Sequence, residues 1–359
     1  MTSPRMRRVR RVRCVVVWIA ALAAGFLGSS GPVAAESDWT RYEALFVTED
    51  GRIVDTGNGG VSHSEGQGWG LLLAEADGDR AGFERIWSWT KKHLGVRQDR
   101  LHAWRWHPDR PDDPTPDMNN ASDGDIYIAW ALLRASARWS VPEWRTAAGG
   151  ILADLTACCV RRQGGHTVLL PGAVGFTREA GVVINPSYWV FPAFDAFQAA
   201  FDAPVWGALS LSGRDLLRAG RFGRWNLPGD WLLLDADGGL ALADGFAPRF
   251  SWDAIRVPLL LAWAEIGAPD LYAPFVAYAG GFAAYPYQPA FTNLDDDSLA
   301  SFALDPGGRA CLALAELTHA QLTGASMPQI DLPPPAAEHS YYTASLLALA
   351  RLARRELGL

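Results

Sequence analysis

The sequence is poor in lysine and in long apolar runs. Of its 32 basic residues only Lys91 and Lys92 are lysine, and 39 acidic residues leave a net charge of −7 over 359 residues. That balance argues against a general nucleic-acid binder, which needs a basic face. The longest apolar run, from Cys14 to Leu27, is shorter than the roughly 20 residues that span a bilayer.

This run belongs to a segment with the three parts of a secretory signal peptide. Residues 1–13 contain six arginines and no acid, the apolar run follows, and Val33-Ala34-Ala35 supplies small residues for cleavage. We expect residues 1–35 to be removed; an uncleaved N-terminal anchor is the alternative. Because the segment holds six arginines and no acid, removal changes the net charge from −7 to −13. We therefore expect a periplasmic or secreted protein without stable membrane insertion that binds neither anionic membranes nor nucleic acid.

Cysteine is also scarce. Cys14 lies in the expected signal peptide, which leaves Cys158, Cys159 and Cys311. An odd number in an exported protein argues against a full disulfide framework, so we expect buried thiols, with one bridge to Cys311 as the alternative. No Cys and His spacing resembles a zinc site. The acidic run 295–297 could suggest calcium, but solvated capping acids are favoured, and we expect no metal and no cofactor.

Apolar residues recur at helical spacing throughout residues 36–359, and many of these stretches begin after Ser, Asp or Pro. Helices are expected at 65–77, 81–95, 124–140, 143–160, 187–201, 204–219, 251–266, 269–280, 308–321 and 340–356. Strand patterns are few, at 166–170, 182–185 and 231–235. The loops 107–122, 281–307 and 322–338 are longer than a helical bundle needs. No linker separates two domains, so we expect residues 36–359 to form one all-α domain of ten to twelve helices.

Three short motifs place acidic residues at expected helix starts. Glu65 opens a helix among three glycines, which cost helix stability and indicate a close approach to the backbone. Asp123 and Asp125 lie two residues apart, and together they exceed what an N-cap requires. Asp253 and Arg256 stand at i and i+3 beside apolar residues. The alternatives are a carboxylate favoured by the helix dipole, an N-cap and a local ion pair.

Aromatic residues accompany these acids. Trp104, Tyr188, Tyr341 and Tyr342 lie at or near expected element starts, and the chain has 16 tryptophans in all. Trp and Tyr rings beside acids are typical of a carbohydrate cleft, because the apolar face of a sugar stacks on a ring while polar groups bind its hydroxyls. We expect these four residues to line such a cleft. Other tryptophans, such as Trp87, are expected in the core.

Around these motifs the sequence resembles glycoside hydrolase family 8, the inverting bacterial endoglucanases and their relatives. From Ala121 to Trp139 it fits the family signature at every specified position. The segments 64–67 and 253–256 fit those that hold the family's catalytic acid and base, and all three agree in order and spacing. The resemblance covers about residues 40–355. It is closest to the periplasmic endoglucanases encoded with bacterial cellulose synthases.

The resemblance implies an (α/α)6 barrel that hydrolyses internal β-1,4 bonds of cellulose with inversion. Glu65 would be the general acid and Asp253 the general base, while Asp123 would bind and help to distort the sugar beside the scissile bond. The residues that contact substrate would be Trp104, Tyr188, Arg256, Tyr341, Tyr342 and Asp125. The resemblance implies a β-glucan polysaccharide as substrate and an association with a cellulose synthase complex.

An inverting mechanism needs one protonated and one ionised carboxyl group. We therefore expect the pKa of Glu65 to be raised by burial and nearby carboxylates, and the pKa of Asp253 to be lowered by Arg256. Relatives in the family also act on xylan, mixed-linkage glucan or chitosan, and these polymers are the alternative substrates. A non-catalytic glycan-binding protein is the more distant alternative.

Overall fold

Eleven α-helices alternate with short strands and long loops in residues 36–359, the part of the chain that the computed structural model describes. The helices are α1 (Asp38–Phe46), α2 (Ser64–Asp77), α3 (Arg80–His93), α4 (Ser122–Trp139), α5 (Pro142–Cys159), α6 (Phe191–Phe201), α7 (Pro204–Ala219), α8 (Val257–Trp263), α9 (Pro269–Gly280), α10 (Pro306–Thr323) and α11 (Tyr341–Leu357). Short 3-10 helices precede two of them: η1 (Pro186–Tyr188) and η2 (Ala254–Arg256). The expected signal peptide, residues 1–35, lies outside the described residues.

The helix boundaries follow from capping chemistry. Side chains of Ser37, Asp79, Asp305 and Ser340 each accept a hydrogen bond from a backbone N–H in the first turn of the helix that follows. All ten expected helices are present, and α1 is an additional one. The expected segments 187–201 and 251–266 each divide into a 3-10 turn and an α-helix, because a proline occupies the first turn of α6 and α8 and starts a new helix there.

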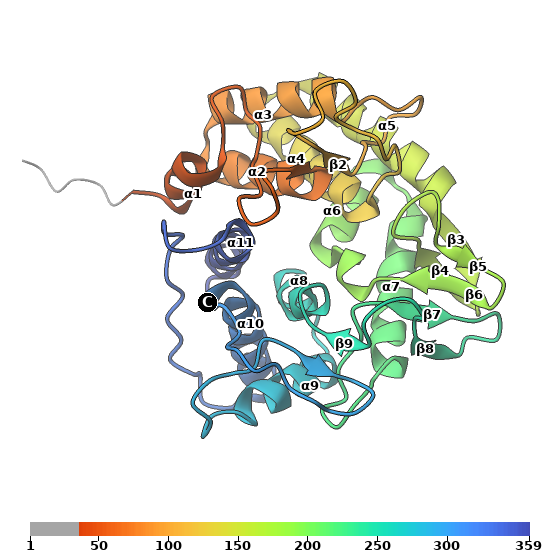
Figure 1. Ribbon diagram of the computed structural model, residues 1–359, viewed down its shortest axis with the longest axis vertical. Coiled ribbons are helices and arrows are strands. Elements are labelled where there is room, and N and C mark those ends of the chain that lie inside the picture. Colours follow the sequence, from red (N-terminus) through yellow and green to blue (C-terminus); the bar gives the residue numbers. More distant parts are fainter. Residues whose placement is uncertain (1–35) are drawn as a thin grey trace, which may run out of the picture. The chain divides into compact units, whose positions relative to one another are not determined.

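The helices form a two-layered ring (Figure 1). Contacts run from α2 to α4, from α4 to α6, from α6 to α8, and through α10 and α11 back to α2. These six are the inner helices; in all of them except α6, which buries one face, most residues are buried, including every residue of α8. A helix that is apolar all round belongs in an interior. The outer helices α3, α5 and α7 instead bury one face and expose the other. The expected all-α (α/α)6 barrel is confirmed.

Close packing of α2 against α4 explains Gly68, one of the three glycines near Glu65, and Gly124 on α4. A side chain on Gly68 would place its Cβ 2.6 Å from Cβ of Tyr127, and one on Gly124 would lie 2.7 Å from the backbone nitrogen of Glu65. Neither position has room for a larger residue. The predicted close approach is therefore between two inner helices, and it brings the first turns of α2 and α4 together.

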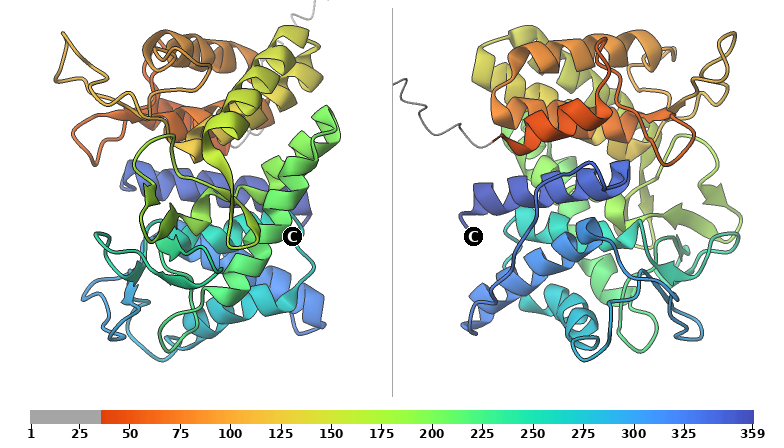
Figure 2. Two further views of the ribbon diagram at one scale, coloured as in Figure 1. Left: turned by 90° about the vertical axis from the view of Figure 1, so that its right-hand side faces the viewer. Right: turned by 60° about the vertical axis from the view of Figure 1, so that its left-hand side comes forward.

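The ten strands are short and all their pairings are antiparallel: β1 (Ser62–His63), β2 (Arg105–Trp106), β3 (Val160–Gln163), β4 (His166–Leu169), β5 (Thr177–Arg178), β6 (Gly181–Ile184), β7 (Leu232–Leu234), β8 (Leu240–Leu242), β9 (Arg249–Phe250) and β10 (Thr292–Asn293). The three expected strand segments coincide with β4, β6 and β7. The largest sheet has the order β5-β6-β7-β8. Figure 2 shows these strands and the long loops at one end of the barrel helices, with the C-terminal end of α11 at the other.

Three further expectations concern the described residues. Cys158, Cys159 and Cys311 are free thiols, the last two buried, so the expectation of unpaired cysteines is confirmed for this part of the chain. Between residues 36 and 359 no helix has the length and apolar character needed to cross a membrane. Asp296 and Asp297 accept hydrogen bonds from the backbone N–H groups of Ser298 and Arg224, so they bind backbone groups but do not cap a helix as expected.

Candidate active site

The predicted acids meet at the end of the barrel that carries the loops. Glu65 lies in the first turn of α2, Asp123 in the first turn of α4, and Asp253 immediately before η2. The sequence separates Glu65 from Asp253 by almost 190 residues, yet both contact the guanidinium of Arg256. Helix N-termini carry a partial positive charge, so the barrel gathers its carboxylates where they are electrostatically favoured.

Arg256 is the centre of this group. Its Nη1 donates to Glu65 Oε1 and lies 3.6 Å from Asp123 Oδ2. Its Nη2 donates to Asp253 Oδ1 at 2.9 Å and to Ser187 Oγ at 2.8 Å. The guanidinium is 4% exposed, whereas the side chains of Glu65 and Asp253 are 23% and 30% exposed. Arg256 therefore contacts Asp253 as predicted, and it is buried while the side chains of Glu65 and Asp253 remain partly exposed.

The pKa of Asp253 differs in direction from the prediction. Burial and, after it, the nearby carboxyl groups of Asp230 and Asp123 raise it to about 8 and together outweigh the hydrogen bonds from Asn185 and Trp231. Burial likewise raises the pKa of Asp123 to about 7. The prediction considered only the adjacent arginine. It was wrong because one cation shared by several buried carboxyl groups cannot offset the loss of water around each.

Asp125 is not placed to contact a substrate, which corrects the prediction. It has no exposed surface, and its Oδ1 accepts hydrogen bonds from the backbone N and the Nδ1 of His102 at 3.0 and 2.9 Å. Its Oδ2 accepts from Asn120 Nδ2 at 3.0 Å. Neither Asp123 nor Asp125 caps α4, whose N-cap position is Ala121. The second acid of the motif instead fixes the start of α4 from inside the protein.

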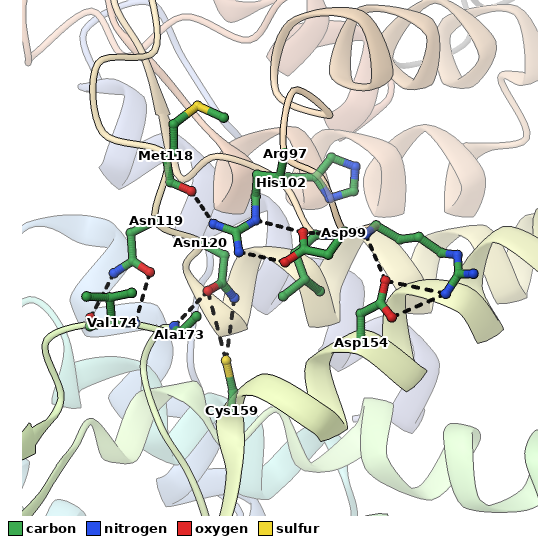
Figure 3. Close-up of polar contacts among 12 residues, drawn as sticks. Arg97, Asp99, His102, Met118, Asn119, Asn120, Asp154, Cys159, Ala173 and Val174 are labelled. Carbon is green, nitrogen blue, oxygen red and sulfur yellow. Dashed lines mark hydrogen bonds and ion pairs between the residues drawn. The ribbon is translucent and has the colours of Figure 1, made fainter.

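Asn120 and the residue before it, Asn119, also bind a neighbouring loop (Figure 3). Asn120 Oδ1 accepts a hydrogen bond from Ala173 N at 2.8 Å, and Asn119 bonds both the N–H and the C=O of Val174. This ties the loop after β4 to the first turn of α4. The loop continues to Phe176, whose ring stacks on Trp231. The hydrogen bonds of Asn119 and Asn120 therefore connect the start of α4, where Asp123 lies, to the loop that carries Phe176.

Tyr341 is a second correction among the predicted substrate contacts. It is 4% exposed and stacks on Trp69, and its hydroxyl lies directly against Gly66, where it leaves no room for a side chain. It is a core residue that packs α11 beneath α2. The next residue, Tyr342, is half-buried and donates a hydrogen bond from its hydroxyl to the carbonyl of Trp252, next to Asp253.

Trp104 and Tyr188 lie beside the acids, partly exposed. The backbone C=O of Trp104 accepts a hydrogen bond from Ser64 N at 3.0 Å, and its ring stacks on His63 at 6.0 Å, next to the start of α2. The guanidinium of Arg256 lies 5.9 Å from the centre of the Tyr188 ring. Both rings are therefore at the edge of the acid cluster, where a bound polymer would pass.

The sequence analysis missed Asp230 and Trp231. Trp231 Nε1 donates to Asp253 Oδ2 at 3.0 Å, and its ring is sandwiched between Phe176 and Phe246 at centre-to-centre distances of 5.9 and 4.4 Å. Asp230 is buried beneath the Asp253 segment. The one available signal was an acid immediately before an expected strand that begins with tryptophan, a pattern too common to single out.

A barrel of paired helices with two half-exposed carboxyl groups and a buried third, bordered by aromatic rings, has the residues that a glycoside hydrolase needs to cleave a sugar polymer. Comparison with known proteins agrees. The family model described as glycosyl hydrolases family 8 matches residues 11–356. A probable endoglucanase of Novacetimonas hansenii is 40% identical over 334 residues, covering 92% of this chain and 94% of the relative.

Solved structures give the same result. A family 8 endoglucanase from Klebsiella pneumoniae superposes with a TM-score of 0.81 at 40% identity, over 89% of this chain and 99% of that one. An endo-β-1,4-glucanase from Acetobacter xylinum superposes with a TM-score of 0.82 at 37% identity, over 90% and 98% of the two chains. The chain belongs to glycosyl hydrolase family 8 and is a glycoside hydrolase.

Proposed function

We propose that this protein is an endo-β-1,4-glucanase that hydrolyses internal bonds of cellulose with inversion, using Glu65 as general acid and Asp253 as general base. The observation that carries the proposal is the meeting of Glu65, Asp123 and Asp253 on one buried guanidinium, from three different inner helices or their approaches. The relatives described as endoglucanases, at about 40% identity over nearly the whole chain, support the reaction.

Glu65 and Asp253, the two partly exposed acids, have different roles in the proposed reaction. Glu65 donates a proton to the glycosidic oxygen as the bond breaks, and Asp253 removes a proton from a water molecule that attacks the anomeric carbon from the opposite face. No covalent sugar–enzyme bond forms, so Asp123 acts on the sugar beside the scissile bond and not as a nucleophile. Its burial beside Arg256 suits a residue that holds one sugar hydroxyl in a fixed position.

The raised pKa of Asp253 has a consequence for this mechanism. A carboxylate with a raised pKa removes a proton from water more readily, but it is ionised only when the pH exceeds that pKa. Activity should therefore fall on the acidic side as Asp253 becomes protonated, at a pH well above the ordinary aspartate value near 3.8.

The substrate would extend along the aromatic rings on either side of the acids. Trp104 lies beside α2, Tyr188 lies beside Arg256, and Trp252, which is 46% exposed, directly precedes Asp253. Sugar rings present apolar faces that stack on such side chains. The mature charge of −13 expected after removal of residues 1–35 suits a neutral polymer.

Export and a role in cellulose synthesis complete the proposal. The arginine-rich start and apolar run of residues 1–35 support a cleaved signal peptide, with residues 36–359 as the single catalytic domain, in the periplasm or outside the cell. A mass measurement of the exported protein tests this directly, because cleavage after Ala35 leaves Glu36 as the first residue. Association with a cellulose synthase complex is the proposed setting, supported by the similarity to the Acetobacter xylinum and Novacetimonas hansenii enzymes.

Reducing-sugar assays on carboxymethylcellulose, mixed-linkage glucan, xylan and chitosan test the substrate. We expect carboxymethylcellulose to give the highest rate, with a rapid fall in viscosity because internal bonds are cut. Absence of product from carboxymethylcellulose together with activity on xylan or chitosan would assign the chain to another specificity of the family. Binding of cello-oligosaccharides without product from any polymer would identify a glycan-binding protein instead.

A further inference from the structure

Asp230 and Trp231 are consecutive residues immediately before β7, and both contact the segment that carries Asp253. Asp230 Oδ1 accepts hydrogen bonds from Ser251 N at 2.9 Å and from Ala254 N at 2.8 Å, and its Oδ2 accepts one from Ser251 Oγ. Trp231 Nε1 donates to Asp253 Oδ2 at 3.0 Å. The two neighbours thus hold the backbone on both sides of Asp253 and one oxygen of its side chain.

The burial of Asp230 costs free energy, which the hydrogen bonds from residues 251–254 offset. Its side chain is 6% exposed, and in residues 36–359 it has no ion pair with Arg, Lys or His. A buried carboxyl group without a cation is normally neutralised or excluded, and burial does raise the pKa of Asp230. Its charge is balanced only by hydrogen bonds from residues 251–254, the segment that presents Asp253.

Trp231 completes the orientation of the Asp253 carboxyl group. Arg256 Nη2 donates to Asp253 Oδ1, so the two oxygens have different donors on opposite sides. The indole itself is fixed between the rings of Phe176 and Phe246, at interplanar angles of 7° and 15°. An N–H held by such a stack has little freedom to move, and it therefore fixes the direction in which Asp253 faces the cleft.

We propose that Asp230 and Trp231 are positioning residues for Asp253: Asp230 fixes the backbone that carries the base, and Trp231 orients its carboxyl group. This inference rests on the proposed function, in which Asp253 is the general base. Neither residue touches the reacting atoms, so each acts through Asp253 alone.

The two residues should change the pH profile in opposite directions. The negative charge of Asp230 raises the pKa of Asp253, whereas the hydrogen bond from Trp231 lowers it, because that bond favours the ionised form. The other groups that face Asp253 are the same residues in both variants. They are Arg256 on η2, Asp123 on α4, Tyr188 on η1, Tyr342 on α11, Asn185 before η1 and, through Arg256, Glu65 on α2.

The test measures kcat/KM on carboxymethylcellulose against pH for the full-length protein and four variants. Asp230→Asn keeps an oxygen for the two backbone N–H groups but removes the charge, and we expect the acidic limb to lie about one pH unit lower. Trp231→Phe keeps a ring in the stack but removes the N–H, and we expect the limb to lie roughly half a pH unit higher. Both should retain the binding of cello-oligosaccharides.

Asp235→Asn is the matched control. Asp235 also lies next to β7 and accepts two backbone N–H bonds, from Asp237 at 2.9 Å and Gly239 at 2.7 Å, but it does not contact the Asp253 segment. Its substitution should leave the acidic limb unchanged. The proposal is overturned if Asp230→Asn leaves the limb in place or raises it, if Trp231→Phe leaves it in place or lowers it, or if Asp235→Asn moves it as far as Asp230→Asn.

A fourth variant separates this inference from the proposed function. Asp253→Asn should abolish the acidic limb together with most of the activity. If Asp253→Asn stays active, Asp253 is not the base and the proposed function fails. If Asp253→Asn is inactive while the other two variants keep the wild-type profile, only the positioning roles fail. Because Trp231→Phe tests the pair independently, the proposal stays falsifiable even if Asp230→Asn does not fold.

Discussion

The two ends of the inner helices hold acidic residues in opposite electrostatic settings. At the N-terminal end, Glu65 on α2, Asp123 on α4 and Asp253 before η2 share one cation, Arg256. At the C-terminal end, Glu75 on α2 binds both Arg134 at 2.6 Å and Arg138 at 2.8 Å on α4. The same pair of helices therefore carries an excess of acid at one end and an excess of base at the other.

The C-terminal group is also balanced as a whole. Arg134 reaches Glu356 on α11 at 2.7 Å, and Glu356 accepts a second hydrogen bond from Trp263 on α8 at 2.7 Å. Carboxylates are unfavourable at the negative ends of helix dipoles, so Glu75 and Glu356 need these arginines. Two acids and two arginines make a neutral network that joins four inner helices.

The difference indicates what each end is for. A network with matched charges joins the helices and stabilises the ring. Three acids on one arginine leave carboxyl groups with raised pKa values facing a cleft, which costs stability and provides groups for proton transfer. Substitutions at the two ends should therefore affect different properties.

The largest effect is expected at the N-terminal end. Glu65→Gln and Asp253→Asn each remove a group that transfers a proton, and we expect kcat on carboxymethylcellulose to fall by about 10²-fold or more. Thermal unfolding should show that both variants remain folded. Glu356→Gln, at the other end of the ring, should keep kcat within twofold of wild type. Hydrolysis above one-tenth of the wild-type rate in either acid variant would show that the roles are misassigned.

Glu75→Gln should give the reverse result. Its side chain is 5% exposed and binds two arginines, so its replacement leaves two partly exposed guanidinium groups with one neutral acceptor. We expect the free energy of unfolding to fall by about 2–3 kcal/mol, since Arg134 and Arg138 can partly recover contact with water. Urea denaturation measures this change. If kcat of the folded variant dropped instead while the urea midpoint stayed constant, the two ends would not be separate in function.

Asp123→Asn should gain stability relative to wild type as the pH rises. Burial raises the pKa of Asp123 in the folded protein to about 7 from its ordinary value near 3.8. Between those values the folded protein binds a proton that the unfolded chain does not, so wild-type stability falls as pH rises through this window. Asparagine does not titrate. We compare the Tm difference between the variant and wild type at pH 4 and at pH 7.5. We expect this difference to shift in favour of the variant by roughly 5 °C between the two pH values.

Scanning calorimetry at several pH values between 4 and 8 measures this difference. A Tm difference that stays constant across the range would mean that Asp123 is not held in a raised-pKa state. Glu75→Gln serves as the comparison from the balanced end.

The smallest effect is expected from Glu356→Gln. Its side chain is 32% exposed, and glutamine can still accept hydrogen bonds from Arg134 and Trp263. We expect the free energy of unfolding to fall by no more than about 1 kcal/mol. Urea denaturation of both Glu356→Gln and Glu75→Gln compares their losses in free energy of unfolding. A larger loss for Glu356→Gln than for Glu75→Gln would contradict the central place of Glu75 in the network.

Local patterns in the sequence predicted the helices and singled out the three acids, whose catalytic roles remain a prediction. Helical periodicity marks each inner helix, and the acids stand in short motifs at helix starts. Their meeting on one guanidinium is a property of the ring, in which inner helices begin at the same end. Periodicity alone could not show it; the resemblance to a family supplied that step.

The errors in the prediction concern residues whose environment is set by distant parts of the chain. Tyr341 and Tyr342 both start α11 and both contact Trp69 of α2, but Tyr341 is buried against Gly66 whereas Tyr342 stays partly exposed. Asp125 differs from Asp123 because His102 and Asn120 enclose it. The pKa of Asp253 depends on Asp230 and Asp123, which are remote from its motif. Each case depends on burial, which spacing within one segment does not reveal.

The configuration of the first product tests the central claim most directly. In the proposed mechanism Asp253 activates water on the face opposite the bond that Glu65 helps to break, so a β-linked glucan must first yield the α-anomer. Proton NMR of cello-oligosaccharide hydrolysis, followed before mutarotation, distinguishes the two anomers. The α-anomer as first product is the predicted result. The β-anomer would mean retention through a covalent intermediate and would contradict the roles given to Glu65 and Asp253.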